Sequence, residues 1–192
     1  MTRILIMGPP GVGKGTQAVR LAGRLDVPSI STGDLFREHV RNGTPLGLEI
    51  GDLLDSGHYV PDEIADELVG LRLAQPDARG GFVLDGYPRT AAQVYALDLI
   101  LAQSSTHLMA VVVLDAETDD IMGRLLQRAA EQGRSDDSPE VIAHRLKVYT
   151  DEAAELIGCY ADRDVLRHVN GTGDPDAVTA RIWKALGLPA ET

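Results

Sequence analysis

Residues 8–16, which read GPPGVGKGT, decide how the chain folds, because they form a nearly complete phosphate-binding loop. Such loops consist of a glycine, four further residues, and then Gly-Lys followed by Ser or Thr. In this chain Gly15 follows Lys14, and the hydroxyl comes one residue late, at Thr16. The apolar run at residues 3–7 predicts a buried strand before the loop, and the apolar spacing within residues 14–25 predicts a helix after it. A phosphate cradle requires this order of strand, glycine loop and helix.

The chemistry of the loop favours binding of a polyanion. Glycines allow several backbone N–H groups to point at one anion, and the positive end of the helix dipole adds to the attraction. The ammonium group of Lys14 is placed to reach the outer phosphates of a nucleotide, with a hydroxyl near Mg²⁺. The alternative is a Gly/Pro-rich turn that contains a lysine by chance, and the flanking strand and helix argue against it.

Composition narrows the class of protein. Of the 192 residues, 44% are hydrophobic and 24% are charged, which is typical of a soluble globular protein with one domain. No apolar run approaches the ~20 residues that a membrane span needs. No signal sequence precedes the first strand, so we expect a cytoplasmic protein without membrane contact. The lone cysteine, Cys159, has no partner for an internal disulfide and cannot form a Cys-rich zinc site.

The charge balance limits the possible ligands. The net charge is −11, from 18 basic and 29 acidic residues. A chain of this charge is a poor candidate for general nucleic-acid binding, which needs a basic face. Since the glycine loop nevertheless predicts an anionic ligand, we expect basic residues to be concentrated locally, around that loop.

Short strands and helices alternate along the chain. Beyond residues 3–7, strand-like runs lie at 27–30, 81–85, 108–115 and 164–170, and helix-like segments lie at 34–43, 45–57, 62–74, 90–103, 117–131, 139–157 and 175–187. This alternation predicts an α/β protein with a P-loop three-layer fold, in which a five-stranded parallel sheet carries helices on both faces. In such sheets ligands bind beyond the carboxyl ends of the strands, so the polar residues that follow each strand are candidates for a site.

The segment LDGYPRT, at residues 84–90, is the most informative of these strand ends. Asp85 ends an apolar strand, where phosphate-loop enzymes place the acidic residue on the Mg²⁺ side. Arg89 follows four residues later. A planar guanidinium can bind a phosphate by donating two parallel hydrogen bonds to its oxygens. Taken singly, Asp85 could be a cap and Arg89 a surface ion pair. Together, after a strand of a phosphate-loop protein, they favour a functional site.

Three motifs, GPPGVGKGTQ, ISTGDLFR and LDGYPRT with Gln93 close behind, resemble in order and spacing those of the adenylate kinases, a family of nucleoside monophosphate kinases. The resemblance extends from Arg3 to about Gly187. It implies the reversible, Mg²⁺-dependent transfer ATP + AMP = 2 ADP, which maintains adenine nucleotide balance. It also implies a monomer whose partners are ATP, AMP and ADP. In this family Gly-Lys-Gly-Thr is the usual form of the loop, so the late hydroxyl is a family trait.

The resemblance assigns roles to individual residues. It implies that ATP is bound by Gly11, Val12, Gly13, Lys14, Gly15, Thr16, Arg124, Arg128 and Gly173. It implies that AMP is bound by Thr32, Arg37, His58, Tyr59, Val60, Gly86, Tyr87, Pro88, Arg89, Gln93, Arg134 and Arg145. The implied catalytic residues are Lys14, Arg89, Arg128, Arg134, Arg145 and Asp85. Thr16 and Asp85 are the implied Mg²⁺-side groups, partly through water, and Gln93 resembles the residue that reads the adenine edge.

The resemblance also divides the chain. The core is expected at residues 1–30, 61–127 and 138–192, with an AMP-binding insert at 31–60 and a short lid at 128–137. Only AAEQG separates Arg128 from Arg134, whereas long members of the family carry a larger lid that sometimes holds four zinc ligands. We therefore expect no structural zinc. Asp136 and Asp137 are the expected lid carboxylates.

Three other functions fit the sequence less well. A UMP or CMP kinase of the same family commonly has alanine where this chain has Thr32, and a kinase for a small metabolite is disfavoured by LDGYPRT. A nucleotide-dependent switch of the small-GTPase type needs a guanine-reading Asn-Lys-x-Asp motif, which the sequence lacks. No Ser-His or Cys-His pair is evident, and phosphoryl transfer requires none.

Overall fold

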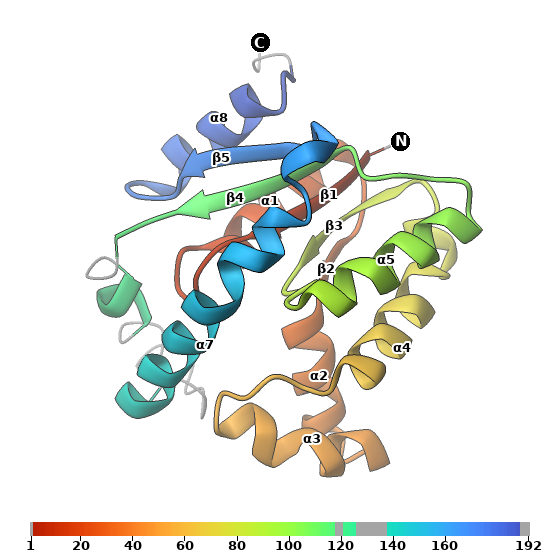
Figure 1. Ribbon diagram of the computed structural model, residues 1–192, viewed down its shortest axis with the longest axis vertical. Helices are drawn as coiled ribbons and strands as arrows, with labels where there is room; N and C mark the ends of the chain where they lie inside the picture. The colour runs from red at the N-terminus through yellow and green to blue at the C-terminus, as the bar shows by residue number, and fades with distance from the viewer. Residues whose placement is uncertain (1, 118–120, 126–137, 189–192) are drawn as a thin grey trace.

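The computed structural model describes residues 2–117, 121–125 and 138–188. Its centre is a five-stranded sheet in the order β2-β3-β1-β4-β5, and every pair of neighbouring strands is parallel. The strands are β1 (Thr2–Met7), β2 (Ser29–Ser31), β3 (Gly81–Asp85), β4 (Ala110–Asp115) and β5 (Leu166–Asn170). Figure 1 shows them side by side, with the helices packed around them. The predicted α/β fold with its parallel sheet is confirmed.

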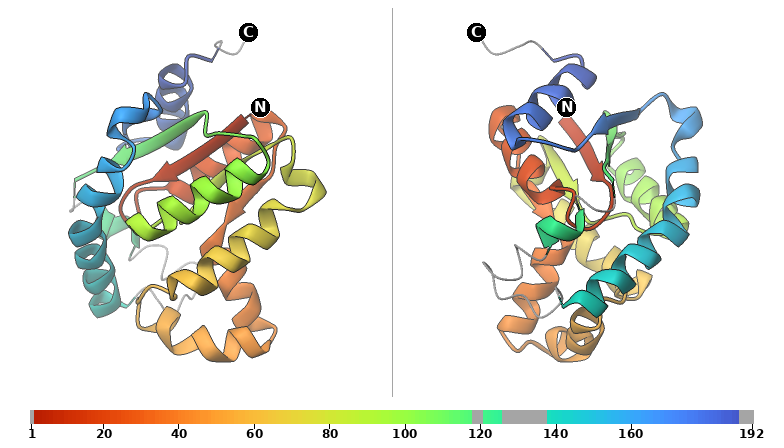
Figure 2. Two further views of the ribbon diagram at one scale, coloured as in Figure 1. Left: turned by 45° about the vertical axis from the view of Figure 1, so that its right-hand side comes forward. Right: turned by 90° about the vertical axis from the view of Figure 1, so that its left-hand side faces the viewer.

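Helices cover both faces of the sheet. One face carries α1 (Lys14–Leu25) and α8 (Pro175–Ala185), and the other carries α4 (Asp62–Leu73), α5 (Ala91–Gln103) and α7 (Pro139–Gly158). The right-hand view of Figure 2 shows these two helical layers on opposite sides of the strands.

Side-chain alternation along β1 explains the two layers. Leu5 and Met7 pack into the cluster that includes α4, α5 and α7 residues, whereas Ile4 and Ile6 pack into the cluster that includes α1 and α8 residues. Successive side chains of a strand point to opposite faces, so a strand covered on both faces has to be apolar throughout. This is why the central strand reads as an unbroken apolar run and not as an alternating one.

A pair of helices, α2 (Thr32–Arg41) and α3 (Pro45–Asp55), extends beyond the sheet and forms the orange lobe at the bottom of Figure 1. Helix α2 begins two residues earlier than the pattern predicted, because the hydroxyl of Ser31 accepts a hydrogen bond from the Asp34 N–H at 3.2 Å and caps it. Thr44 caps α3 in the same way. The two helices cross closely at Gly47, where a Cβ atom would lie 2.1 Å from the carbonyl oxygen of His39.

The loops that follow β1, β3 and β5 lie at one edge of the sheet, because the carboxyl ends of the parallel strands meet there. Strand β1 lies between β3 and β4, and the helices that follow β1 and β3, α1 and α5, go to opposite faces. In α/β sheets this divergence opens a crevice in which ligands bind. Short 3₁₀ turns at η1 (Pro76–Ala78) and η3 (Ala161–Arg163) lie before β3 and β5. Among the described residues, no helix combines the length and apolar composition that crossing a membrane requires.

Candidate active site

The glycine loop connects β1 to α1 at the carboxyl edge of the sheet. Gly8, Gly11 and Gly13 have positive φ angles of 141°, 80° and 102°. A Cβ atom on Gly8 would lie 2.6 Å from the carbonyl oxygen of Leu114, so the neighbouring strand also requires glycine there. The Lys14 ammonium donates to the carbonyl oxygens of Gly8 at 2.8 Å and Pro9 at 2.9 Å. These bonds hold the charge of Lys14 over the loop.

A cavity of about 790 Å³, here called the large cavity, opens in front of this loop. Arg124 donates from one terminal nitrogen to the carbonyl oxygens of Val12 and Gly171, both at 3.2 Å, and so ties the glycine loop to the loop after β5. The volume lies in the range of nucleotide and cofactor sites. The predicted ATP-binding residues that line it are Gly11, Val12, Gly13, Lys14, Gly15, Thr16, Arg124 and Gly173.

Asp85 lies at the end of β3, in the wall of the large cavity. Its Oδ1 atom is buried and has no hydrogen-bond partner among the described residues. Burial raises the pKa of this carboxyl group, and the charges of Lys14 and Arg89 oppose the rise. Thr16 lines the same cavity. Hard cations such as Mg²⁺ prefer oxygen ligands, so an orphaned carboxylate oxygen beside a hydroxyl and an anion cradle fits a Mg²⁺-nucleotide.

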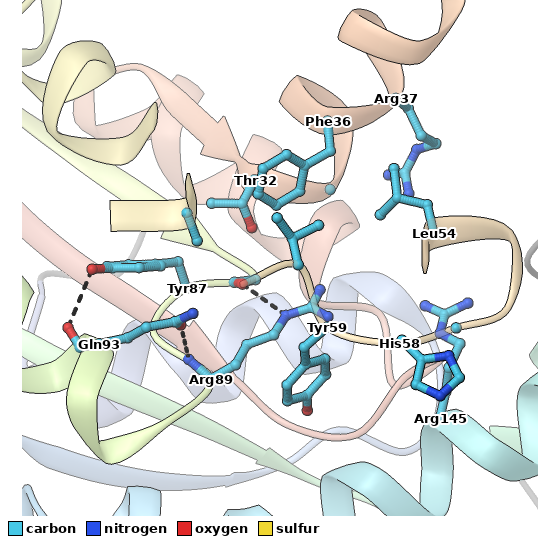
Figure 3. A pocket seen from close by; sticks show the side chains of 15 residues that line it. Thr32, Phe36, Arg37, Leu54, His58, Tyr59, Tyr87, Arg89, Gln93 and Arg145 are labelled. Atoms are coloured by element: carbon cyan, nitrogen blue, oxygen red, sulfur yellow. Dashed lines mark hydrogen bonds between the residues drawn. The ribbon is translucent and has the colours of Figure 1, made fainter. Parts of the chain in front are cut away.

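A second, narrow pocket of about 50 Å³ lies between α2, α3, the loop after β3 and the start of α5 (Figure 3). Apolar walls come from Phe36, Leu54, Val60 and Ala65. Polar groups come from predicted AMP-binding residues, and the lining includes Thr32, Arg37, His58, Tyr59, Gly86, Tyr87, Arg89, Gln93 and Arg145.

Gly86 determines how close the two sides of the narrow pocket approach. Its φ angle is +83°, and a Cβ atom would lie 2.7 Å from the hydroxyl of Thr32 and 3.4 Å from a terminal nitrogen of Arg89. Thr32 is buried, and its hydroxyl lies 3.4 Å from the carbonyl oxygen of Asp85. Any other residue at position 86 would therefore be strained and would displace Thr32.

Arg89 and Arg145 lie where the narrow pocket meets the large cavity, since both side chains line both spaces. The Nε atom of Arg89 donates to the carbonyl oxygen of Gly86 at 2.8 Å, and the guanidinium lies 4.9 Å from the ring centroid of Tyr59. These contacts orient the planar group (Figure 3). Arg37 also lines both spaces and pairs with Asp34 at 2.7 Å. The predicted concentration of positive charge near the glycine loop is thus present in the structure.

Gln93 lies in the first turn of α5 with only 3% of its surface exposed. Its Oε1 atom accepts from the Arg89 N–H at 2.7 Å, and its Nε2 atom donates to Asp62 Oδ1 at 2.7 Å. The other oxygen of Asp62 accepts from the Thr90 hydroxyl at 2.8 Å, and Thr90 caps α5 by accepting from the Gln93 N–H. The Tyr87 hydroxyl, whose pKa is raised by burial, donates to Asp66 Oδ1 at 2.6 Å and lies 3.2 Å from the backbone carbonyl oxygen of Gln93. The amide of Gln93 is therefore held from both ends.

The loop between α3 and α4 contacts α7. Gly57 has a φ of +76°, and a Cβ atom there would lie 2.8 Å from Arg145 Cγ. The His58 ring lies 4.5 Å from the His144 ring, and its Nδ1 atom is 2.9 Å from the Ser56 hydroxyl. Through these contacts the predicted insert reaches the helix that carries Arg145.

A third space of about 70 Å³, here called the rear cavity, is lined in part by Tyr59 and Arg89. Pro88, predicted to bind AMP, lines this cavity and not the narrow pocket. The Tyr87–Pro88 peptide bond is cis. Tyr149 of α7 closes the other side, and burial raises its pKa to about 12.

Four predicted residues, Arg128, Arg134, Asp136 and Asp137, lie outside the described residues. Conversely, Asp62, which hydrogen-bonds the Gln93 side chain, lies outside every motif recognised in the sequence and was not predicted as a site residue. The contribution of Phe36, Leu54 and Ala65 to the apolar walls of the narrow pocket was also not predicted. The apolar spacing within their helices indicated only that these side chains would be buried.

Comparison with known proteins identifies the family. A family model described as adenylate kinase matches residues 6–165. The adenylate kinase of a Nocardioides species is 50% identical over 190 residues, which cover 99% of this chain and all of the relative. The adenylate kinase of Kocuria rhizophila is 52% identical over 186 residues, or 97% of this chain and 99% of the relative. That of Bifidobacterium longum is 52% identical over 184 residues, or 96% and 99%.

These similarities agree with the architecture of the site. The matched region contains the glycine loop, the narrow pocket and Arg145. Relatives of at least 50% identity are matched along nearly their whole length. The chain belongs to the adenylate kinase family, and its function is that of a nucleoside monophosphate kinase, a phosphotransferase.

Proposed function

We propose that the chain transfers the terminal phosphoryl group of ATP, bound in the large cavity, to AMP, bound with its base in the narrow pocket. The observation that carries this proposal is the position of Arg89 and Arg145, which line both spaces at their junction. A phosphoryl group that moves between two nucleotides has to pass through this junction. Positive charge held there is the electrostatic environment that the transfer needs.

The narrow pocket supports AMP as the acceptor. The Gln93 amide has four hydrogen-bonding positions, and Asp62 and Arg89 occupy two of them. One Nε2 hydrogen and one Oε1 lone pair remain for the N1 and N6 atoms of adenine. Thr32 narrows the wall beside the base, and Arg37 and Arg89 carry charge for the phosphate. Apolar contacts from Phe36 and Leu54 would pack against the ring.

Catalysis in this arrangement needs no nucleophile from the protein. An oxygen of the AMP phosphate attacks the terminal phosphorus of ATP, and the bond from that phosphorus to the bridging oxygen of ADP breaks. Lys14, Arg89 and Arg145 stabilise the negative charge on the oxygens of the phosphoryl group during its transfer, and the two pockets align the two nucleotides. When bound beside Thr16 and Asp85, Mg²⁺ would neutralise part of the phosphate charge.

We also propose that separate segments of the chain form the core, the AMP-binding insert and the lid. Residues 31–60 act as the AMP-binding insert on the core formed by 1–30, 61–127 and 138–192. Residues 128–137, with Arg128, Arg134, Asp136 and Asp137, lie outside the described residues, and we assign them to a short lid from the family resemblance alone. The single cysteine cannot form a Cys-rich zinc site. A monomer that works in the cytoplasm is what the family resemblance implies.

Coupled measurement of ADP formation tests the proposal. The protein should form two ADP for each AMP consumed in the presence of Mg²⁺ and ATP, and should form almost none from ATP alone, because water is a poor substitute for a positioned acceptor. Equal ADP formation with and without AMP would instead indicate an ATPase.

Metal dependence can be tested in the same assay. Excess EDTA should abolish turnover, and added Mg²⁺ should restore it, because Asp85 and Thr16 lie beside the phosphate cradle. Restoration by zinc alone would contradict the assignment of these residues to Mg²⁺.

A further inference from the structure

We propose that Asp62 is a positioning residue that fixes the orientation of the Gln93 amide and thereby makes the narrow pocket select adenine over guanine. The proposal rests on the proposed function, in which Gln93 reads the base of the acceptor. Nothing in the adenylate motifs points to Asp62, which lies at the first position of α4, outside them.

The contacts of the amide define its orientation. Asp62 Oδ1 is 2.7 Å from Gln93 Nε2, and the Arg89 N–H is 2.7 Å from Gln93 Oε1. An ionised carboxylate only accepts hydrogen bonds, and a backbone N–H only donates them. A flipped amide would therefore place its oxygen against the carboxylate and its NH₂ against the N–H. Both contacts would become repulsive, so the flip is opposed at both ends.

Asp62 itself has little freedom to move. Its second oxygen accepts from the Thr90 hydroxyl at 2.8 Å, and that hydroxyl also caps α5 through the Gln93 N–H at 3.2 Å. The carboxylate is thus tied to the backbone of the same helix turn that carries Gln93. A hydrogen bond to a charged group in a poorly solvated site is stronger than one between neutral groups.

The orientation matters because adenine and guanine present opposite patterns. Adenine offers a donor at N6 and an acceptor at N1, which match the free lone pair of Oε1 and the free hydrogen of Nε2. Guanine offers an acceptor at O6 and a donor at N1, which would require the flipped amide. Since Asp62 and Arg89 oppose that flip, GMP can bind only by leaving polar groups unpaired.

Asparagine at position 62 would remove this constraint with little change in shape. Its side chain can accept from Nε2 or donate to Oε1, so it tolerates either orientation of Gln93. Only the Arg89 N–H would then oppose the flip. The structure also provides a matched control in Asp66, one turn further along α4. It accepts from the Tyr87 hydroxyl at 2.6 Å, and among the described residues it makes no hydrogen bond to the side-chain amide of Gln93.

The test compares Asp62→Asn, Asp66→Asn and the unchanged protein, with AMP and GMP as acceptors at saturating Mg²⁺-ATP. We expect Asp62→Asn to lower the AMP-to-GMP ratio of kcat/KM by about tenfold or more, as expected when one discriminating polar contact is lost. The change should lie mainly in KM for AMP, with kcat within about threefold, because the phosphate-binding charges are untouched. Asp66→Asn should leave the ratio within about twofold, as expected for a group without contact to the amide.

The outcomes separate this inference from the function on which it rests. An unchanged AMP-to-GMP ratio in a folded Asp62→Asn protein, with the unchanged protein still preferring AMP, would overturn the role of Asp62 alone. An equal loss in Asp62→Asn and Asp66→Asn would assign the effect to general damage of α4 and would also overturn it. A preference of the unchanged protein for GMP or a pyrimidine nucleotide would refute the proposed function. Thermal unfolding of all three proteins verifies that they are folded. If Asp62→Asn does not fold, Asp62→Ala serves as the second variant: it removes the acceptor and should also lower the AMP-to-GMP ratio, and an unchanged ratio in it would overturn the role of Asp62.

Discussion

The large cavity and the narrow pocket meet at Arg89 and Arg145, yet they are built from different materials. Seven glycines and a set of charged side chains, among them Lys14, Arg124 and Arg145, line the large cavity, and these groups are suited to phosphates. Residues of five helices and two loops line the narrow pocket, and both polar ends of the Gln93 side chain are held in place. All nucleotides carry phosphates, but their bases differ. Discrimination between nucleotides should therefore arise mainly in the narrow pocket.

This contrast leads to a general expectation for substitutions. Changes in the large cavity should reduce turnover with every pair of nucleotides, because they act on the phosphates. Changes in the narrow pocket should alter the choice of acceptor, because they act on the base.

Lys14→Met should reduce kcat by about 10²–10³, the usual cost of removing one preorganised charge from a transition state. The Lys14 ammonium lies within hydrogen-bond distance of the Gly8 and Pro9 carbonyl oxygens, over the loop that would hold the phosphates. Steady-state kinetics with AMP and with CMP should show the same fractional loss for both acceptors. An unchanged turnover number, with a normal unfolding temperature, would contradict the role of Lys14.

Gln93→Leu should lower kcat/KM for AMP by about 2–3 kcal/mol, or roughly 10²-fold, because it removes both base contacts and leaves Asp62 and the Arg89 N–H unpaired. The preference for AMP over CMP should become smaller in the same measurement. An equal fractional loss of kcat/KM with both acceptors would indicate that Gln93 acts on the phosphates, and it would contradict the assignment of Gln93 to base recognition.

Gly86→Ala should raise KM for AMP by about tenfold, because the new methyl group would displace the Thr32 hydroxyl, only 2.7 Å away. Gly173→Ala is a matched control: its φ is also positive, at +98°, but the closest atom to its methyl group would be Arg181 Nη2 at 3.7 Å. Both variants should lose about 1–2 kcal/mol of folding stability from backbone strain. Only Gly86→Ala should raise KM for AMP. An equal rise of KM for AMP in both variants would contradict the contact with the Thr32 hydroxyl as its cause.

Tyr59→Leu should have the smallest effect, about 1 kcal/mol or roughly fivefold in kcat/KM for AMP, since it removes the ring that lies 4.9 Å from the Arg89 guanidinium. Tyr59→Phe keeps the ring and should stay close to the unchanged protein. If Phe and Leu behave alike, packing alone accounts for Tyr59 and the cation–π contact contributes nothing measurable.

The sequence predicted the fold well because its signals are local. An apolar run, a glycine loop and a helical period each lie within a few residues, and the strands observed at Thr2–Met7, Gly81–Asp85 and Ala110–Asp115 overlap the predicted ones closely. Strand β2 was less well defined, since only Ser29–Ser31 pair with β3, whereas the pattern predicted residues 27–30. Such boundaries depend on tertiary pairing, which a local pattern does not contain.

The site was predictable where a motif carries it and hidden where tertiary contacts create it. Lys14, Asp85 and Arg89 each stand within a recognisable stretch, and the structure brings them around one cavity. Asp62 contacts Gln93 across 31 positions of sequence, and His58 contacts His144 across a still longer separation. Only the packing of α4 on α5, and of the loop at Gly57 on α7, brings these pairs together.

One measurement tests the contrast between the two regions most directly: initial rates of the unchanged protein for every combination of the donors ATP, dATP and GTP with the acceptors AMP, GMP, CMP and UMP. We expect a change of donor to alter kcat/KM by about tenfold or less, because the glycines and charged side chains of the large cavity act on the phosphates. We expect replacement of AMP to lower kcat/KM by about 10³-fold or more, because buried, matched polar groups discriminate strongly. A protein that phosphorylates CMP, UMP or GMP as efficiently as AMP, or that is stricter for the donor than for the acceptor, would contradict this contrast.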